Sequence, residues 1–309
     1  MNRRTFLKYQ TAGLIGLAAG APLMISAGRA LAQAASAAPD VAVVKGAPGP
    51  AVRAAVELLG GMGRFVKAGQ KVVIKPTMSF ARGPETAANT HPEVVRELVI
   101  LCREAGAGRI RVLDNPLHNP EQCLELSGIL AAVESVEAGL CRQVREERFY
   151  LETDLPQARE MRRNAVMREV LEADVLIAAP VAKSHAGAGV SLTLKGQMGL
   201  ILNRHVMHSR YALDTAIADL ATLLKPRLSV IDATRVLTSN GPGGPGLVIT
   251  PGEIIASADP VAADATCVAS YEWYGRKFQP RQVAHLAAAG ELGLGRLDIE
   301  NLTTRRLAL

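Results

Sequence analysis

Aromatic residues are scarce in this sequence. Phe, Trp and Tyr make up 4% of its 309 residues, with one tryptophan, and no run of Lys and Arg is interleaved with them. Proteins that bind single-stranded nucleic acid use such aromatic side chains as stacking platforms for the bases. The composition therefore argues against this class of protein, and we expect no nucleic-acid partner.

Closely spaced cysteines are also lacking. The four cysteines, Cys102, Cys123, Cys141 and Cys267, include no C-x-x-C pair. Ferredoxin-type iron–sulfur clusters and zinc ribbons require such pairs, so we expect no ferredoxin-type iron–sulfur cluster. An oxidising compartment permits disulfides, whereas buried free thiols need none, and the sequence leaves the state of these thiols open.

An excess of charge is absent once the N-terminus is set aside. The net charge is +6, but residues 1–32 contain four basic side chains and no acidic one, which leaves 31 basic against 29 acidic side chains in residues 33–309. A balance this even gives no reason to expect a polyanionic partner. Hydrophobic residues at 49% and charged residues at 21% are typical of a globular protein with a buried core.

The N-terminus resembles a twin-arginine export signal. Residues 3–8 read RRTFLK, an apolar stretch follows over residues 11–27, and residues 30–32 form an Ala-Leu-Ala site. A charged region, an apolar region and a small-residue site together form a secretory signal. We therefore predict export by the twin-arginine machinery, cleavage near Ala32 and a periplasmic location.

The alternative for this segment is an uncleaved membrane anchor. Glycines and Pro22 dilute residues 11–27, whereas a membrane-spanning helix needs about 20 predominantly apolar residues. We expect no stable membrane span after the signal is cleaved.

Strand-like and helix-like patterns alternate along residues 33–309. Short apolar runs predict strands at 41–45, 71–75, 109–113, 174–179 and 228–231. Amphipathic patterns predict helices at 51–59, 92–105, 211–224 and 260–273. This alternation indicates an α/β fold with a mostly parallel sheet flanked by helices. We expect residues 33–309 to form a single domain with a small irregular insertion at residues 140–165.

Residues 182–199 combine small residues with ionisable side chains after a predicted strand. Ligands of such sheets bind outside the carboxyl ends of the strands. We expect a loop that leads into a helix, whose free N–H groups and dipole would attract an anion. The alternative is that the glycines serve tight turns and the lysines are solvated. The candidate residues in this segment are Lys183, Ser184, His185, Gly187, Gly189 and Lys195.

Two further strand ends carry candidate residues. Lys75 ends one predicted strand, and Asp232 follows another. A lysine suits a carboxylate, a phosphate or a developing oxyanion, and a carboxylate can transfer protons. After Asp232, the glycine- and proline-rich residues 239–246 form either a cover over the site or a plain wide turn.

His205 and His208 are three residues apart, which places both on one face of a helix. Such a pair can contribute to a metal site, although no carboxylate stands at the usual offset. Histidines without a metal are the alternative.

Helix starts account for several other polar residues. Thr90 and Glu93 have the spacing of a capping box, so Thr90 is the expected N-cap of the helix that follows. Asp259 is the expected N-cap of the helix predicted at 260–273. His91 and Asp264 are left without an assigned role.

Several segments of the chain together resemble one known family. They read VVIKP at 72–76, THPEVV at 90–95, ADVLI at 173–177, KSH at 183–185 with LTLKGQMG at 192–199, IDA at 231–233 with GP at 241–242, and ADPVAAD at 258–264. In this order they resemble the family called domain of unknown function 362. Some members carry ferredoxin-like iron–sulfur modules, which implies redox or metal-linked work for those members. This chain departs from the family pattern at Lys195-Gly196 and Pro76-Thr77, where Lys-Asn and Pro-Asn are usual.

The leading hypothesis is an exported α/β protein whose cleft binds a small anionic ligand. Lys75, Lys183, His185, Lys195 and Asp232 would form the cleft. In an enzyme, His185 or Asp232 would act as acid or base, and the lysines would stabilise a carboxylate, phosphate or enolate-like charge. A desolvated lysine such as Lys195 could itself serve as the base. The alternative is a non-enzymatic periplasmic accessory protein that holds a metal or cofactor for a redox partner.

Overall fold

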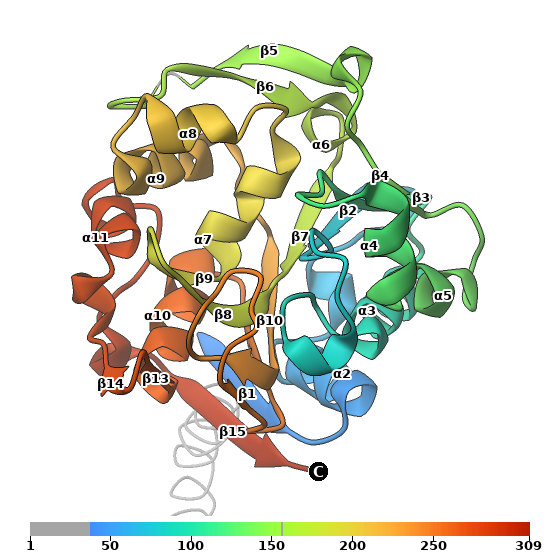
Figure 1. Cartoon of the computed structure of the whole chain (residues 1–309). Coiled ribbons are helices and arrows are strands. Elements are labelled where there is room, and N and C mark those ends of the chain that lie inside the picture. Colours follow the sequence, from blue (N-terminus) through green and yellow to red (C-terminus); the bar gives the residue numbers. More distant parts are fainter. Residues whose placement is uncertain (1–37, 156) are drawn as a thin grey trace, which may run out of the picture. The chain divides into compact units, whose positions relative to one another are not determined.

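One large sheet, with helices on both faces, organises the fold (Figure 1). The computed structural model describes residues 38–155 and 157–309, so the predicted export signal lies outside the described residues. Within the described part the sheet has eleven strands, and its main path runs β15-β1-β12-β10-β7-β2-β3-β4. The strands of this path are β15 (Thr304–Ala308), β1 (Val41–Lys45), β12 (Glu253–Ser257), β10 (Leu228–Leu237), β7 (Val175–Ala179), β2 (Lys71–Pro76), β3 (Arg109–Asp114) and β4 (Cys141–Gln143).

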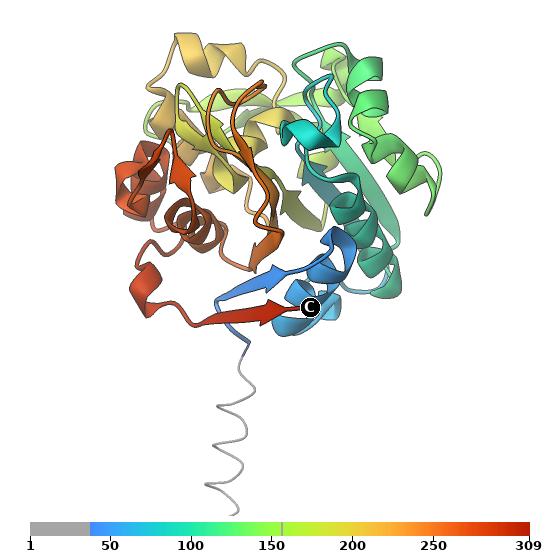
Figure 2. The ribbon, with the colours of Figure 1, turned by 60° about the horizontal axis from the view of Figure 1, so that its bottom comes forward.

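The sheet is mostly parallel, as the sequence predicts. Every neighbouring pair on the main path is parallel except the two pairs that β12 makes, with β1 and with β10. Figure 2 shows β15 lying beside β1 at one edge of the sheet. Three short strands extend the sheet off this path: β8 (Val181–His185) and β11 (Val248–Ile249) pair with β10, and β9 (Gly189–Ser191) pairs with β8.

The helices form one layer on each face of the sheet (Figure 1). One layer contains α2 (Pro48–Leu58), α3 (Pro92–Glu104), α4 (Pro120–Leu126) and α5 (Ile129–Glu134). The other contains α7 (Thr193–Gly196), α8 (His205–Ser209), α9 (Leu213–Leu223), α10 (Pro260–Ser270) and α11 (Ala284–Glu291). The short helix α6 (Arg168–Leu171) precedes β7.

Side chains of the strands point alternately to the two faces of the sheet, so the core has one part under each helix layer. In β1, Ala42 and Val44 pack in the cluster that contains α2 and α3, whereas Val41 and Val43 pack in the cluster that contains α9 and α10. Successive side chains of a strand point to opposite faces, so a strand covered on both sides must be apolar throughout. This requirement explains the continuous apolar runs of the sequence.

The charged stretch at residues 140–165 contains regular structure. Its first residues form β4, and its later residues contribute to an antiparallel hairpin of β5 (Tyr150–Asp154) and β6 (Arg163–Met167), which pair with each other and not with the large sheet. A second small hairpin joins β13 (Glu272–Trp273) and β14 (Arg276–Lys277). Within the described residues, no helix has the length and apolarity needed to cross a membrane.

All four cysteines are buried free thiols. The structure also changes two expectations about the local backbone. The predicted strand at 228–231 extends to Leu237, because β8 and β11 pair with its second half. The expected loop after residue 182 is the β8–β9 hairpin, in which Gly189 adopts a φ of +73° that favours glycine.

Candidate functional site

A cavity of about 250 Å³ opens where β2 and β8 meet α7, α8 and the segment between those helices. We call it the cationic pocket, because the basic side chains of Lys75, Lys183, Lys195 and Arg204 all line it. Three histidines and an apolar group complete most of the wall. These residues are His185, His205, His208, Phe80, Leu117, Met198 and Pro242.

Lys75 reaches the pocket from the carboxyl end of β2 and is held by Asp114. Its Nζ lies 3.2 Å from Oδ1 of Asp114, which ends the neighbouring strand β3 and is fully buried. The other carboxylate oxygen of Asp114 accepts hydrogen bonds from the Met78 N–H (3.0 Å) and the Ser79 hydroxyl (2.7 Å). Burial lowers the pKa of Lys75, and the Asp114 charge opposes that change.

Gly199 allows this ion pair to form. A Cβ at this position would lie 2.0 Å from Oδ1 of Asp114 and 2.8 Å from Nζ of Lys75. Any side chain here would therefore push the pair apart, so glycine is required by close approach.

Lys183 lies in β8 and is 1% exposed. Its Nζ donates a 2.7 Å hydrogen bond to the Ala88 carbonyl and lies 4.3 Å from the centre of the Phe80 ring. Burial, followed by the charge of Lys75, lowers the pKa of Lys183 well below its usual value. Lys183 is therefore a fixed donor at the inner wall of the pocket.

Arg204 closes the pocket on the side of α8. One of its guanidinium nitrogens donates to the carbonyl of Asn115, and the Asn115 amide in turn donates to the Ile201 carbonyl at 2.9 Å. Burial lowers the pKa of Arg204, although an arginine stays charged at any physiological pH. Arg204 therefore supplies a permanent positive charge.

Lys195 differs from the other three basic residues because it has no hydrogen bond or ion pair with any described residue. It is 8% exposed and sits in α7, whose first N–H groups, those of Thr193 and Leu194, donate to Asp264 at 2.8 and 3.0 Å. Burial, followed by the charges of Arg204 and Lys75, lowers the pKa of Lys195 to about 7.

Asp264 corrects the expectation that this helix start binds an anionic ligand. The buried carboxylate already occupies the N–H groups that the sequence offered to an anion. Burial raises the pKa of Asp264 to about 7, against the two N–H hydrogen bonds that favour its charged form. Asp264 thus orients α7, and through it Lys195.

His185 and His208 stack in the pocket with ring centres 6.0 Å apart and planes 17° from parallel. Nδ1 of His185 accepts a 3.1 Å hydrogen bond from the Gly187 N–H. Burial, followed by the charge of Lys195, lowers the pKa of His185 to about 3, so its ring is neutral at pH 7. In residues 38–155 and 157–309, no group of three or more His, Cys, Asp or Glu side chains is placed to hold a metal ion.

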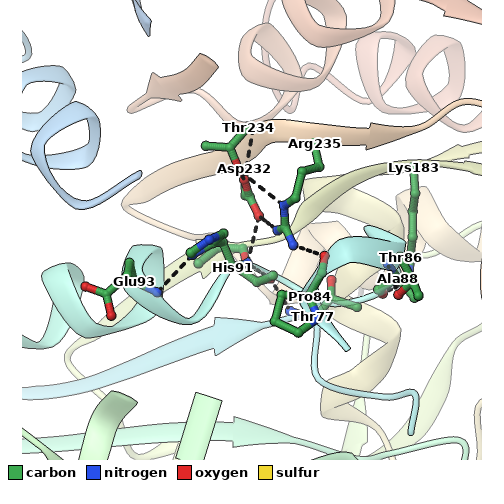
Figure 3. A network of polar contacts seen from close by, with 12 residues as sticks. Thr77, Pro84, Thr86, Ala88, His91, Glu93, Lys183, Asp232, Thr234 and Arg235 are labelled. Atoms are coloured by element: carbon green, nitrogen blue, oxygen red, sulfur yellow. Dashed lines mark hydrogen bonds and ion pairs between the residues drawn. The ribbon is translucent and has the colours of Figure 1, made fainter. Parts of the chain in front are cut away.

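Asp232 does not line the cationic pocket; it lies in the polar network of Figure 3, which also includes Lys183 of the pocket. Its buried carboxylate accepts hydrogen bonds from the His91 N–H (2.7 Å), the Thr234 N–H (3.0 Å), the Thr234 hydroxyl (2.6 Å) and the Arg235 guanidinium (2.7 Å). With four donors, this carboxylate has no free acceptor to offer a substrate. The structure gives Asp232 the role of joining β10 to the start of α3.

Three other sequence candidates shape the β8–β9 hairpin and do not line the pocket. The Ser184 hydroxyl accepts a 3.0 Å hydrogen bond from the Gly241 N–H, Gly187 belongs to the turn, and Gly189 is the first residue of β9. Gly187 contributes indirectly because its N–H holds the ring of His185. The structure therefore brings Lys75, Lys183, His185, Lys195, His205 and His208 together and leaves Ser184, Gly187, Gly189 and Asp232 outside.

Asp114 and Arg204 are not among the candidate residues that the sequence indicates. Asp114 ends a strand at the same sheet edge as Lys75, and this position is a signal that the sequence contains. Arg204 lies between the pocket and Asn115 in a connection with no sequence pattern, so nothing in the sequence marks it.

One family model matches more than half of the chain. The family model described as "Domain of unknown function (DUF362)" matches residues 72–269, a range that contains all four basic residues of the pocket. A thylakoid-associated protein of Synechocystis sp. is 28% identical over 253 residues, which cover 79% of this chain and 74% of that protein.

Two solved structures are also similar. The lactate racemase apoprotein of Thermoanaerobacterium thermosaccharolyticum has a TM-score of 0.46 and 14% identity, over 71% of this chain and 54% of that one. A Thermotoga maritima protein has a TM-score of 0.40 and 15% identity, over 72% of this chain and 59% of that one. The chain thus spans little more than half the length of either.

Proposed function

Since the chain belongs to the DUF362 family, whose name states no activity, we propose a function from its own pocket: the protein binds a small anionic ligand there. The observation that carries this proposal is the gathering of four basic side chains around one cavity of about 250 Å³, with Asp114 as the one carboxylate paired to them among the described residues. Like charges that are buried together repel one another, and a bound anion would relieve that repulsion.

The size and lining of the pocket limit the ligand. A cavity of about 250 Å³ has the volume of roughly eight molecules of liquid water. The basic groups suit a carboxylate or a phosphate, and Phe80, Leu117 and Met198 provide an apolar wall for a short carbon skeleton. We infer a ligand with one or two anionic groups and a few carbon atoms.

The same residues support acid–base work on such a ligand. Lys195 changes protonation near pH 7 and touches the cavity, so it can accept or donate a proton there. Lys183 and Arg204 hold positive charge or N–H donors where an enolate-like oxygen would develop. We propose Lys195 as the acid–base group and His185 as a neutral partner.

Thermal unfolding of the full chain in inorganic phosphate and in acetate tests the anion site. We expect the melting temperature to rise with the concentration of either anion, because ligands that bind the folded state stabilise it. Lys183→Ala and Lys195→Ala should each remove most of this response. Lys225→Ala, at an exposed lysine, is the matched control and should keep it. An unchanged response in both pocket variants would refute the site.

We further propose that the protein is exported by the twin-arginine route and works in the periplasm. The RRTFLK run and the Ala-Leu-Ala site support this proposal. Cell fractionation combined with intact mass of the mature protein tests it. The expected product starts near Gln33, and replacing Arg3 and Arg4 with lysine should keep the precursor in the cytoplasm. Periplasmic delivery of that double variant would refute the twin-arginine route.

The alternative of a metal- or cofactor-holding accessory protein would use the neighbouring rings of His185 and His208, which stack in the pocket with centres 6.0 Å apart. Elemental analysis of protein purified with its signal intact separates it from the anion site. Stoichiometric metal that is lost in both His185→Ala and His208→Ala would favour this alternative over the metal-free pocket.

A further inference from the structure

We propose that the Lys195 amine forms a covalent imine with a ligand that carries both a carbonyl group and an adjacent carboxylate, as in a short 2-oxo acid. This proposal rests on the proposed function, because it places the carboxylate of that ligand among the basic residues of the cationic pocket.

The first support is the difference in partners among the pocket amines. Nζ of Lys75 is paired with Asp114, and Nζ of Lys183 donates to the Ala88 carbonyl. Lys195 has no such partner among the described residues, although it lines the same cavity and is 8% exposed. Its amine is therefore the one of the three pocket lysine amines that no hydrogen bond or ion pair with a described residue holds in place.

The second support is the environment that makes this amine reactive. A lysine is nucleophilic only when neutral, and proteins achieve this by desolvation and by neighbouring cations. Both are present at Lys195, since burial and then the charges of Arg204 and Lys75 lower its pKa to about 7. At pH 7.5 it has roughly 10² to 10³ times more neutral amine than a surface lysine with an ordinary pKa.

The third support is charge balance, which selects the class of carbonyl compound. An iminium carries one positive charge, so a neutral aldehyde or ketone would add a cation to a pocket that already holds Arg204 and Lys75. A ligand with its own carboxylate brings the compensating negative charge. The volume of about 250 Å³ suits a skeleton of a few carbon atoms.

The reaction involves no oxidation or reduction. The Lys195 lone pair forms a bond to the carbonyl carbon while the C=O π electrons move to oxygen, and a proton passes from nitrogen to that oxygen to give a carbinolamine. The hydroxyl group then takes a proton from solvent and leaves as water, with the nitrogen lone pair forming the C=N bond of the iminium. His208, exposed at the same cavity, is placed to carry that proton between solvent and the leaving oxygen.

Reductive trapping tests the imine. The full chain is incubated with pyruvate and sodium cyanoborohydride at pH 7.5, and the adduct is located by intact mass and peptide mapping. We expect one adduct per chain, at Lys195, and at least about tenfold less at the exposed Lys225. Methyl pyruvate, which lacks the carboxylate charge, should label Lys195 at least about tenfold more slowly than pyruvate relative to Lys225.

Lys195→Arg is the matched variant, because it keeps a positive charge and lacks a nucleophilic amine. It should abolish the single adduct while the phosphate response is retained at least in part. Peptide mapping of the wild-type protein decides the question even if this variant does not fold. Labelling spread evenly over surface lysines, or no label at Lys195 in protein that still responds to phosphate, would overturn the imine and leave the anion site standing. Loss of both the label and every anion response would refute the proposed function itself.

Discussion

Lys195→Met should make the folded protein more stable at neutral pH, although it removes a residue of the proposed site. Lys195 is 8% exposed, and no hydrogen bond or ion pair with a described residue compensates its charge. Methionine has a similar unbranched shape and no charge, so it keeps the packing and removes the cost of the buried ammonium. The effect has a definite dependence on pH.

The magnitude follows from the pKa of Lys195, which burial and then Arg204 lower from 10.5 to about 7. Between these values the folded state binds fewer protons than the unfolded state, so stability rises with pH. The penalty is complete below pH 7, where it is about 5 kcal/mol at about 1.4 kcal/mol per pH unit, and it vanishes above pH 10.5. Between pH 7 and pH 9 the unfolding free energy of the wild type should therefore rise by about 2 kcal/mol relative to that of the variant.

Urea denaturation followed by the fluorescence of Trp273, the single tryptophan, measures both proteins. The indole is fully buried and donates to the Val268 carbonyl, so it reports the loss of the core. Lys225→Met, at an exposed lysine, should show no such dependence on pH. A free-energy difference between Lys195→Met and the wild type that is equal at pH 7 and pH 9 would mean that Lys195 titrates normally, and the reasoning would fail.

Three further substitutions distinguish residues of the proposed ligand site from residues that only stabilise the fold around it. In Gly199→Ala the new Cβ would lie 2.0 Å from the Asp114 carboxylate. We expect it to cost about 1–3 kcal/mol of unfolding free energy and to weaken the phosphate response. Gly63→Ala, with open space at its Cβ, is the control and should change neither quantity. Asp232→Asn should cost about 3 kcal/mol in urea denaturation, because it unpairs a buried arginine, and change the phosphate Kd by less than about twofold; a tenfold change would place Asp232 in the ligand site. Asp264→Ala should cost about 2–4 kcal/mol by leaving two buried N–H groups unpaired, and a loss below about 1 kcal/mol would show that water replaces the carboxylate.

The elements of the fold could be predicted because their signals are local. In β1, alternate residues pack against two different apolar layers, so the sequence of the strand is a continuous apolar run. Helix α10 begins at Asp259 as expected, since its carboxylate accepts from the Val261 and Ala262 N–H groups at 2.8 and 2.9 Å. Both signals involve residues within a few positions of each other.

The start of α3 shows where local reasoning fails. The capping-box spacing predicts Thr90 as the N-cap, but His91 holds that position, and its Nδ1 accepts from the Glu93 N–H at 3.1 Å. The Thr90 hydroxyl instead donates to the Ala179 carbonyl at 2.7 Å and accepts from the Thr77 N–H at 2.9 Å. The end of β7 and the residue just after β2 thus bind the Thr90 hydroxyl, which is then unavailable as a cap. Neither partner is part of the local capping motif, so the motif alone does not reveal them.

Lys195 and Asp232 show what distinguishes the proposed ligand site from a structural site in this fold. The sequence offered both as ionisable residues near the sheet, and both are buried. Asp232 meets four donors, one of them the N–H of His91, which is 141 positions away in the chain. The charge of Asp232 is therefore compensated by direct hydrogen bonds, whereas Lys195 has no hydrogen bond or ion pair with a described residue, and the charge of Asp214 offsets only part of the effect of burial on its pKa. Since a buried charge without a bonded partner is costly, Lys195 is the residue that an incoming anion would stabilise. Whether a buried ionisable side chain has a hydrogen-bond or ion-pair partner depends on the fold. The lack of such a partner among the described residues therefore identifies the proposed ligand site more specifically than the residue type does.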